Sequence, residues 1–355
     1  MKKILYTLFA VSLLAVGCTQ EVSVTRYHDI DAEVTDLQTK MEMSTLYCNL
    51  NESTSVDLQK LNEYLTEKDA DVVMFVSPVS VNGTNFKQWL EGYAASVGGL
   101  IVLESSNDVP SPLTMTALVK DKWSLETYNL LQGASLVNPI LHFKANGIHF
   151  VVSELNEARN AIPDDWQEQV EEMTANKKKV PLVYDPDNLA ARKSELSYII
   201  KQTVDNKAYL KDENWLFAIN MNAESHLDIV KYEKEFYLEN YYAAPTNPTS
   251  GSFDWYEFFE TETSYFSVDE LLAANDIYFN ASQLMIYYDL IDCSAVMNSA
   301  YVPSSCGNEE GQRCNFVYAT SECWSMFQTL SHDTAVAEEL GVTHYPIIVT
   351  LKSEE

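Results

Sequence analysis

Glycine is scarce in this sequence, with 11 residues in a chain of 355. This is about 3% of the chain, against about 7% in an average globular protein. Loops that cradle phosphate groups with backbone amides need several glycines at fixed spacing, and neither GxGxxG nor GxxxxGK(S/T) occurs. The sequence therefore argues against a Gly-rich nucleotide-binding loop.

Basic residues are also few. The chain has 23 Lys and Arg against 52 Asp and Glu, which gives a formal net charge of -29 at pH 7. The electrostatic field of such a negative charge repels polyanions and removes the electrostatic contribution that drives most binding to DNA and RNA. We therefore expect no nucleic-acid partner. The apolar fraction of 46% and the aromatic fraction of 12% are those of a globular protein with a substantial core.

The first residues of the chain have the layout of an export signal. Lys2 and Lys3 precede an apolar run over residues 4–16. This run is too short to span a bilayer and matches the core of a signal peptide. No later run of the sequence is apolar enough to cross a membrane. Residues 1–17 are therefore expected to be removed on export.

The end of this run, Leu14-Ala15-Val16-Gly17-Cys18, resembles a bacterial lipobox, with Ala15 where Leu is usual. The resemblance implies cleavage before Cys18 and attachment of diacylglycerol to its thiol, and more than one acyl chain makes such an attachment stable. We therefore expect a protein of the bacterial cell envelope, with the outer membrane as its partner through the lipid anchor. An ordinary secretory signal with an incidental cysteine is the alternative.

Five cysteines follow Cys18, and an exported protein meets an oxidising compartment in which disulfides form. At least one of the five must stay unpaired, and the sequence leaves the connectivity open. One or two disulfides are expected among the last four. A zinc site is the alternative, although the CxxC spacing of structural zinc sites is missing. The five are Cys48, Cys293, Cys306, Cys314 and Cys323.

Strands and helices are expected to alternate along most of the chain. Continuous apolar and β-branched residues over 71–76 indicate a strand covered on both faces. Asn146-Gly147, between the apolar runs 141–145 and 148–152, indicates a hairpin, because these residue types accept the positive φ angles of a type I′ turn. Further strands are expected at 44–50, 100–103, 114–119, 215–219, 315–319 and 347–351, and helices after the capping cluster 53–55, at 86–93 and from Asp185-Pro186 onward.

This mixture of strand runs, hairpins and a few helices indicates a sheet-rich α+β or α/β fold. No internal repeat and no long linker divides the chain. Residues 41–355 are therefore interpreted as a single domain. The polar, aperiodic residues 18–40 are interpreted as a tether between the signal peptide and this domain.

Six fragments occur in order, each at an expected strand end: YCNLN at 47–51, ADVVMFVS at 70–77, FVVSEL at 150–155, WLFAINMNAES at 215–225, RCNFVYA at 313–319 and VTHYPIIV at 342–349. They resemble YNIR, PDVVALQE, FVVTHL, ILAGDFNAxS, RIDYIYA and SDHYPIIV of the endonuclease/exonuclease/phosphatase family, the DNase I-like phosphoesterases. The resemblance covers nearly the whole mature chain. It implies an α+β fold in the form of a four-layer α/β/β/α sandwich.

The chemistry that this resemblance implies is Mg²⁺-assisted hydrolysis of a phosphoester by an activated water. A hard divalent cation needs negatively charged oxygen ligands. The acidic metal ligand of the family falls at Ser77, the Asp that activates water falls at Asn220, and the Asp near the C-terminus falls at Thr343. All three side chains are neutral in this sequence.

Two further positions of the implied site have changed their chemistry. The His that helps to hold the phosphate falls at Glu154, whose charge would repel a phosphate group. The Asp that orients the catalytic His falls at Asn315. The implied site therefore keeps a polar scaffold without the charges that perform the reaction. The matching polar residues are Asn49, Asn222, Arg313 and His344.

These replacements are large in their effect on rate. A general acid or base contributes about 10²–10⁴ and an electrostatic stabiliser about 10²–10³, although such factors do not simply multiply. We therefore expect a non-catalytic relative with no metal and no cofactor, which binds an uncharged ligand or an envelope protein. The alternative is a Mg²⁺-dependent phosphodiesterase or endonuclease-type hydrolase with an altered site.

A relocated acid and base pair is a third interpretation. Glu154 and His344 should face the same cleft if the alignment of fragments holds. His226 and Asp228 are better explained as solvated residues of a loop after a strand. The full candidate set is Glu154, Glu157, Glu224, His226, Asp228 and His344.

Two other groups of charged residues have simpler explanations. His142 and His149 lie on either side of the Asn-Gly turn. Two histidines in such positions are able to bind one metal ion together, but no third ligand is near in sequence. We interpret them as cross-strand histidines on the surface. The run Lys177-Lys178-Lys179 is interpreted as a solvated loop rather than an anion site, because its surroundings are acidic.

Residues 232–266 are unusually aromatic, with 12 Phe, Trp and Tyr in 35 residues. The favoured interpretation is a long insertion packed against the sandwich. The alternative is a surface that contacts a ligand or a partner through Trp255 and Tyr256, since Tyr and Trp suit contacts that are both apolar and hydrogen-bonded.

Overall fold

The structure is a computed structural model. It describes residues 19–20, 22–27, 42–105, 111–128, 130–131, 136–158, 161, 164–165, 168–169, 172, 188–205, 213–223, 225, 281–297 and 313–352. Several predictions on sequence lie outside these residues: the signal peptide 1–17, Cys18, Cys306, the Lys177-Lys178-Lys179 run, Glu224, His226, Asp228, Trp255 and Tyr256.

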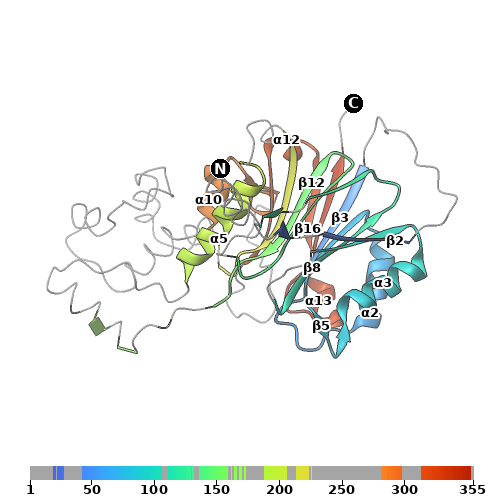
Figure 1. Ribbon diagram of the computed structural model, residues 1–355, viewed down its shortest axis with the longest axis horizontal. Coiled ribbons are helices and arrows are strands. Elements are labelled where there is room, and N and C mark those ends of the chain that lie inside the picture. Colours follow the sequence, from blue (N-terminus) through green and yellow to red (C-terminus); the bar gives the residue numbers. More distant parts are fainter. Residues whose placement is uncertain are drawn as a thin grey trace, which may run out of the picture.

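Two large mixed sheets stack face to face at the centre of the molecule (Figure 1). The seven-stranded sheet has the order β16 (Phe327–His332), β17 (Ile347–Lys352), β3 (Glu42–Asn49), β4 (Val72–Pro78), β8 (Leu113–Lys120), β7 (Leu100–Ser105) and β2 (Val22–Tyr27). The six-stranded sheet has the order β14 (Ile291–Asp292), β15 (Asn315–Ala319), β13 (Asn214–Asn220), β12 (Ile148–Glu154), β11 (Ile140–Ala145) and β9 (Leu125–Tyr128). Two minor pairs are β1 (Thr19–Gln20) with β10 (Leu130–Leu131), and β5 (Ser80–Val81) with β6 (Thr84–Asn85).

Helices cover the outer face of each sheet (Figure 1). The seven-stranded sheet is covered by α2 (Leu58–Lys68), α3 (Phe86–Val97) and α13 (Thr334–Leu340). The six-stranded sheet is covered by α5 (Leu189–Gln202) and α10 (Ser282–Tyr287). The short helices α11 (Cys293–Met297) and α12 (Ser321–Trp324) flank β15. The predicted four-layer α/β/β/α sandwich is therefore confirmed.

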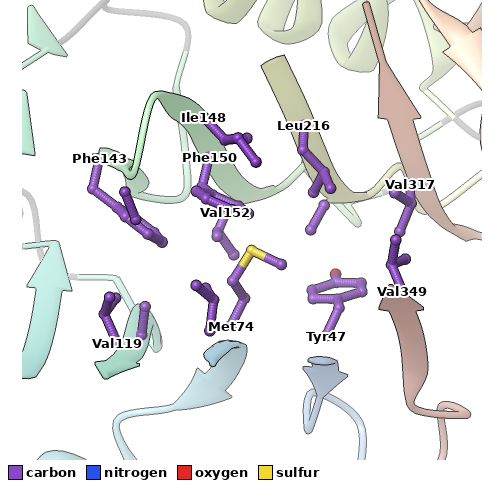
Figure 2. Close-up of a cluster of buried hydrophobic side chains, with 14 of the residues drawn as sticks. Tyr47, Met74, Val119, Phe143, Ile148, Phe150, Val152, Leu216, Val317 and Val349 are labelled. Atoms are coloured by element: carbon purple, nitrogen blue, oxygen red, sulfur yellow. The ribbon is translucent and has the colours of Figure 1, made fainter. Parts of the chain in front are cut away.

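The layers follow from the two-residue period of a strand, which sends successive side chains to opposite faces. In β3, Tyr47 enters the core between the sheets, whereas Cys48 enters the core under the helices. Figure 2 shows Met74 and Tyr47 of one sheet pointing toward Phe150 and Leu216 of the other. Both faces of the central strands are buried, which explains why their sequences are continuously apolar.

The predicted strands and the hairpin are confirmed. Asn146 and Gly147 have φ angles of 46° and 81°, and the flanking residues Ala145 and Ile148 pair across the turn. No Cβ is present in Gly147 to oppose its left-handed conformation. Strand β12 of this hairpin also pairs with β13, and the ends of these two strands contribute to the site described below.

Two predicted helix starts are wrong. The N-cap of α2 is Asp57, whose carboxylate accepts from the backbone N–H groups of Gln59 and Lys60, and not the cluster 53–55. Asp caps well because its carboxylate reaches those two amides. Helix α5 begins at Leu189, after Asn188 in a left-handed conformation, and not at Asp185-Pro186.

The interpretation of residues 18–40 as an aperiodic tether needs correction for part of this range. Residues 22–27 form strand β2, which pairs antiparallel with β7 and closes one edge of the seven-stranded sheet. Val22 and Val24 alternate with Ser23 and Thr25 in the two-residue period of a strand. The open edge of β7 supplies the backbone partners, which a sequence pattern alone does not reveal.

The disulfides expected among the last four cysteines do not form within the described residues. Cys48, Cys293 and Cys323 are buried free thiols, and no bridge joins any of them to Cys314. Cys48 lies under the helices, whereas Cys293 and Cys323 lie between the sheets. Burial raises the pKa of the Cys323 thiol to about 12 and also raises the pKa of Cys48 and of Cys293, which disfavours the reactive thiolate form.

The prediction of surface histidines at 142 and 149 is wrong. His142 and His149 are 3% and 2% exposed, and Nε2 of His142 lies 3.0 Å from Nδ1 of His149. His149 stacks on Trp215, and its Nε2 lies 2.7 Å from the Glu213 carboxylate. The two imidazoles therefore belong to the packing of the six-stranded sheet against its outer layer.

No helix in the described part of the chain has the length and apolar character needed to cross a membrane.

Candidate functional site

Polar side chains from both sheets meet at one edge of the sandwich. Strand β3 ends at Asn49, β12 ends at Glu154 and β13 ends at Asn220. Strands β12 and β13 are parallel and pair Glu154 with Asn220, and Asn220 pairs with Asn315 at the start of the antiparallel β15. Because parallel strands end at the same edge, the topology brings together residues that lie far apart in sequence.

The carboxylate of Glu154 is the centre of this edge. It is only 2% exposed. Its Oε1 accepts from Nδ2 of Asn51 at 2.5 Å and from Nδ2 of Asn222 at 3.2 Å. Its Oε2 accepts from Nδ2 of Asn49 at 3.2 Å. Glu154 is therefore a buried carboxylate enclosed by carboxamide donors.

Backbone groups fix the orientation of these amides. The oxygen of Asn49 accepts from the backbone N–H of Asn51 at 2.8 Å, so its nitrogen must face Glu154. The nitrogen of Asn222 donates to the backbone carbonyl of Leu155 at 2.7 Å, so it is also assigned as the donor. A carboxamide has one acceptor side and one donor side, and the backbone partners decide which side meets the carboxylate.

A second chain of bonds leads from Asn49 to His344. Oδ1 of Asn315 accepts from Nδ2 of Asn49 at 2.9 Å and from the Tyr47 hydroxyl at 3.2 Å. Its Nδ2 then faces Nδ1 of His344 at 2.9 Å. Since Nδ1 accepts this bond, the imidazole hydrogen is on Nε2. Glu154 and His344 thus face the same network, as the sequence predicts.

Carboxylates line the outer rim of this network. Oε2 of Glu52 lies 3.8 Å from Nε2 of His344, and Oε2 of Glu157 lies 3.5 Å from Nδ2 of Asn51. Glu52 is 53% exposed, whereas His344 is 3% exposed. The described partners of Glu154 and His344 are amides, a thiol and a carboxylate, and none of them is Lys or Arg.

Burial sets the titration of the site. It raises the pKa of Glu154 to about 7, and the amide hydrogen bonds from Asn222, Asn51 and Asn49 act in the opposite direction. It lowers the pKa of His344 to about 4, so this imidazole is neutral at pH 7. It also raises the pKa of Glu52, with the charge of Glu157 as the second cause. Desolvation disfavours the charged form of each group.

These residues do not fit a magnesium ion. Mg²⁺ needs an octahedron of oxygen ligands with at least one available carboxylate. The Glu154 oxygens already accept from three amides, and backbone partners fix the orientation of two of them, Asn49 and Asn222. Within the described ranges, no group of three or more His, Cys, Asp or Glu side chains is arranged to hold a metal ion.

Most of the site residues predicted from sequence come together. Asn222, Asn49 and Asn315 donate or accept in the network around Glu154, and His344 closes it. Asn220 is buried beside Glu154 in the sheet, where its Oδ1 accepts from the backbone N–H of Asn222 at 2.9 Å.

Three predicted positions take no part in the side-chain hydrogen bonds described above around Glu154 and His344. The prediction of Arg313 as a cleft residue is wrong, because its guanidinium forms a buried bidentate ion pair with Asp292 at 2.8 and 2.6 Å and lies over Phe316. Ser77 is fully buried in β4, where it pairs with Thr114 across the sheet. Thr343 is at the rim and donates to the backbone carbonyl of Glu52 at 3.2 Å.

Sequence reasoning missed Asn51, Tyr47, Glu52 and Cys314 as members of the site. Asn51 and Glu52 come two and three residues after the end of β3, and the alternation Tyr47-Cys48-Asn49 places Tyr47 on the same face as Asn49. Cys314 precedes Asn315, and its Sγ lies 3.9 Å from Nδ1 of His344. The signal for Asn51 and Glu52 was their place shortly after a strand end, where polar side chains meet at a sheet edge.

The fold is similar to that of solved phosphoesterases. An AP endonuclease from Archaeoglobus fulgidus matches with a TM-score of 0.52 at 12% identity, over 87% of this chain and 99% of that chain. A 3'-5' exonuclease from Neisseria meningitidis matches with a TM-score of 0.49 at 9% identity, over 87% and 99% of the two chains. A humanized TDP2 from D. rerio has a TM-score of 0.47 at 8% identity, over 88% and 99%.

No protein-family model matches this sequence, and no curated protein matches it. The likeness to solved structures is at low identity and concerns the fold. The chain has the DNase I-like phosphoesterase fold.

Proposed function

We propose that this chain is a non-catalytic binding or interaction protein that uses a DNase I-like phosphoesterase fold. The observation that carries the proposal is the Glu154 carboxylate, which lies at the centre of the sheet edge and accepts from Asn49, Asn51 and Asn222. The hydrolases that the sequence resembles have a phosphate-holding His at this position. A carboxylate would repel a phosphate group, and no described Lys or Arg contacts it to offset the charge.

The remaining groups do not restore phosphoester hydrolysis. Hydrolysis needs a group that activates water and an electrophile that stabilises the developing charge. The side chain at the water-activating position is Asn220, an amide that has no proton-accepting nitrogen or charged oxygen. The side chain that hydrogen-bonds to Nδ1 of His344 is the amide of Asn315, at the position where the resemblance implies an Asp. Each replacement removes a contribution of about 10²–10⁴ in rate.

The chemistry of the edge favours an uncharged ligand or a protein partner. Carboxamides and carboxylates bind hydroxyl and amide groups by hydrogen bonds, and the rim carboxylates Glu52 and Glu157 disfavour anions. The net charge of -29 acts in the same direction over the whole surface. A polyanionic partner such as nucleic acid is therefore not part of the proposal.

A hydrolysis assay with and without a chelator tests the proposal. The purified protein is given phosphodiester and phosphomonoester substrates with Mg²⁺, and we expect no chelator-sensitive turnover. Glu154→Gln serves as the matched variant, because it keeps the size of the side chain and removes its charge. Chelator-sensitive turnover that Glu154→Gln abolishes would contradict the proposal and favour the alternative, a Mg²⁺-dependent hydrolase with an altered site.

The cellular place of the protein is part of the same proposal. The lipobox-like sequence at Cys18 supports a lipid anchor in the bacterial outer membrane. We expect the wild-type chain in the membrane fraction and the Cys18→Ser variant outside it, since acyl chains provide the attachment. Equal membrane association of both chains would contradict the anchor.

A further inference from the structure

The strongest unexplained feature of the site is a thiol beside an imidazole that is itself beside a carboxylate. Sγ of Cys314 lies 3.9 Å from Nδ1 of His344, and Nε2 of His344 lies 3.8 Å from Oε2 of Glu52. The thiol and the carboxylate thus face opposite nitrogens of one imidazole ring. This is the arrangement in which a nucleophile, a base and a group that orients the base act together.

We infer that Cys314 is a nucleophilic thiol for which His344 is the base and Glu52 a positioning residue, and that it captures acyl groups from uncharged carboxylic esters. This inference does not rest on the proposed binding function, because it involves neither a metal nor a phosphoester. It also gives this sheet edge a chemistry other than phosphoester hydrolysis.

The tautomer of His344 suits this role. The Asn315 amide donates to Nδ1 at 2.9 Å, and the orientation of this amide is fixed by Tyr47 and Asn49 on its oxygen. The single lone pair of Nδ1 accepts from Asn315, so Nδ1 takes a proton from the thiol 3.9 Å away only when this amide bond is released, and Nε2–H faces Glu52. Nε2 is buried and has no hydrogen-bond partner within the part of the chain that the structure describes, so an approach of Glu52 by less than 1 Å would complete the bond.

Asn315 also supports a charged sulfur. Its Nδ2 lies 3.7 Å from Sγ of Cys314 as well as 2.9 Å from Nδ1 of His344. When Nδ1 accepts the thiol proton, it no longer accepts from Asn315, and the amide can then donate to the thiolate. An amide donor to the thiolate favours its formation.

The exposure of the thiols separates Cys314 from the other described cysteines. Cys314 is partly exposed, whereas Cys48, Cys293 and Cys323 are buried. Burial raises the pKa of the Cys323 thiol to about 12, and it also raises the pKa of Cys48 and of Cys293. Among these four, Cys314 alone combines access with a neighbouring base.

The chemical step is an acyl transfer. The Cys314 thiol gives its proton to Nδ1 of His344, and Sγ attacks the carbonyl carbon of the ester. The bond from this carbon to the alkoxide oxygen breaks, and the leaving alkoxide takes the proton from Nδ1. The products are a thioester on Cys314 and a free alcohol, and no oxidant or reductant is needed. The rim carboxylates Glu52 and Glu157 favour an uncharged ester over an anionic one.

The test uses p-nitrophenyl acetate with the full chain. We expect release of one equivalent of p-nitrophenolate and an acetyl group on Cys314, located by mass spectrometry of peptides. Cys314→Ser should lose this acetylation. His344→Gln should slow it at least about 100-fold, the scale of a general base.

Glu52 provides a variant that avoids the buried core, because this side chain is 53% exposed. Glu52→Gln should slow acetylation of Cys314 about 10-fold, since the carboxylate orients and stabilises the imidazolium. Glu339→Gln, on the exposed face of α13, makes the same change of charge and should leave the rate unchanged. The inference is overturned if Glu52→Gln and Glu339→Gln react alike, or if Cys314 reacts no faster in the folded chain than in urea.

Discussion

Glu154 is a residue whose environment conflicts with its charge. The carboxyl is 2% exposed, and burial raises its pKa to about 7 from an ordinary value of 4.5. A folded-state pKa above the unfolded-state pKa means that the folded chain binds more protons between these values. The contribution of Glu154 to stability is therefore present below about pH 4.5 and is lost as the pH rises toward 7.

This gives a prediction at the residue scale. The free energy of unfolding of the wild-type protein should fall relative to that of Glu154→Gln between pH 4.5 and 7, by up to about 3 kcal/mol. Urea denaturation of both proteins at several pH values measures the difference between their free energies of unfolding. The contributions of all other titrating groups cancel in this difference. A difference that is constant with pH would show that this carboxyl has an ordinary pKa.

His142 is a buried residue whose contribution to stability depends on pH in the opposite direction from that of Glu154. Its pKa is lowered to about 3 by burial, and next by the nearby His149 and Lys144. The unfolded chain binds a proton near pH 6.5 and the folded chain does not, so stability falls as the pH decreases from 6.5 toward 3. The imidazole stacks on Tyr128 with 4.4 Å between ring centroids, a contact that a phenyl ring can keep.

We therefore expect His142→Phe to lose less stability on acidification than the wild type, by about 1.4 kcal/mol per pH unit below 6.5. At pH 7 the variant should be less stable by about 1 kcal/mol, because the hydrogen bond to His149 is lost. Denaturation curves at pH 7 and pH 4.5 check both values. Parallel losses in the two proteins would contradict a neutral buried imidazole.

At the scale of elements, the C-terminal end of α13 positions one side of the site. Gly341 ends this helix with φ 67°, and the backbone N–H of Asp57 donates to the carbonyl of Leu340 at 2.8 Å. A Cβ at Gly341 would overlap the backbone carbonyl of Ser55. The segment that carries Glu52 therefore packs closely against the segment that leads to His344.

The expected result is that Gly341→Ala destabilises the protein by at least about 2 kcal/mol, from the left-handed φ and the backbone overlap. Gly92→Ala is the matched control, because Gly92 lies inside α3 with open space around it. That change should stabilise the protein by about 1 kcal/mol, the difference in helix propensity. Thermal unfolding distinguishes the two, and equal effects would refute the close packing.

The elements that were predictable from sequence are those with a local signal. The strand at 71–76 and the Asn146-Gly147 turn depend on side-chain types within a few residues, and both are confirmed. Strand β2 was missed because its partner, β7, lies more than 70 residues further along the chain. The Asp57 cap was missed because any nearby Ser, Thr or Asp could have capped α2.

At the scale of the whole molecule, the order of six fragments predicted the layers and most of the site. The sequence could not predict the partner of Arg313, because its ion pair with Asp292 depends on a contact between segments that the fold brings together. It also could not predict that His142 and His149 are buried, since the Trp215 ring that both contact lies more than 60 residues further along the chain. The fold class was thus predictable, and side-chain partners across elements were not.

We propose that the sheet edge does not bind the metal of a phosphoesterase. Calorimetric titration of the purified protein with Mg²⁺ tests it most directly, with Glu154→Gln titrated in parallel. We predict no saturable binding at micromolar Mg²⁺ for either chain. Saturable binding by the wild type that is lost in Glu154→Gln would contradict the account, because it would mean that this carboxylate has left its amides to become a metal ligand.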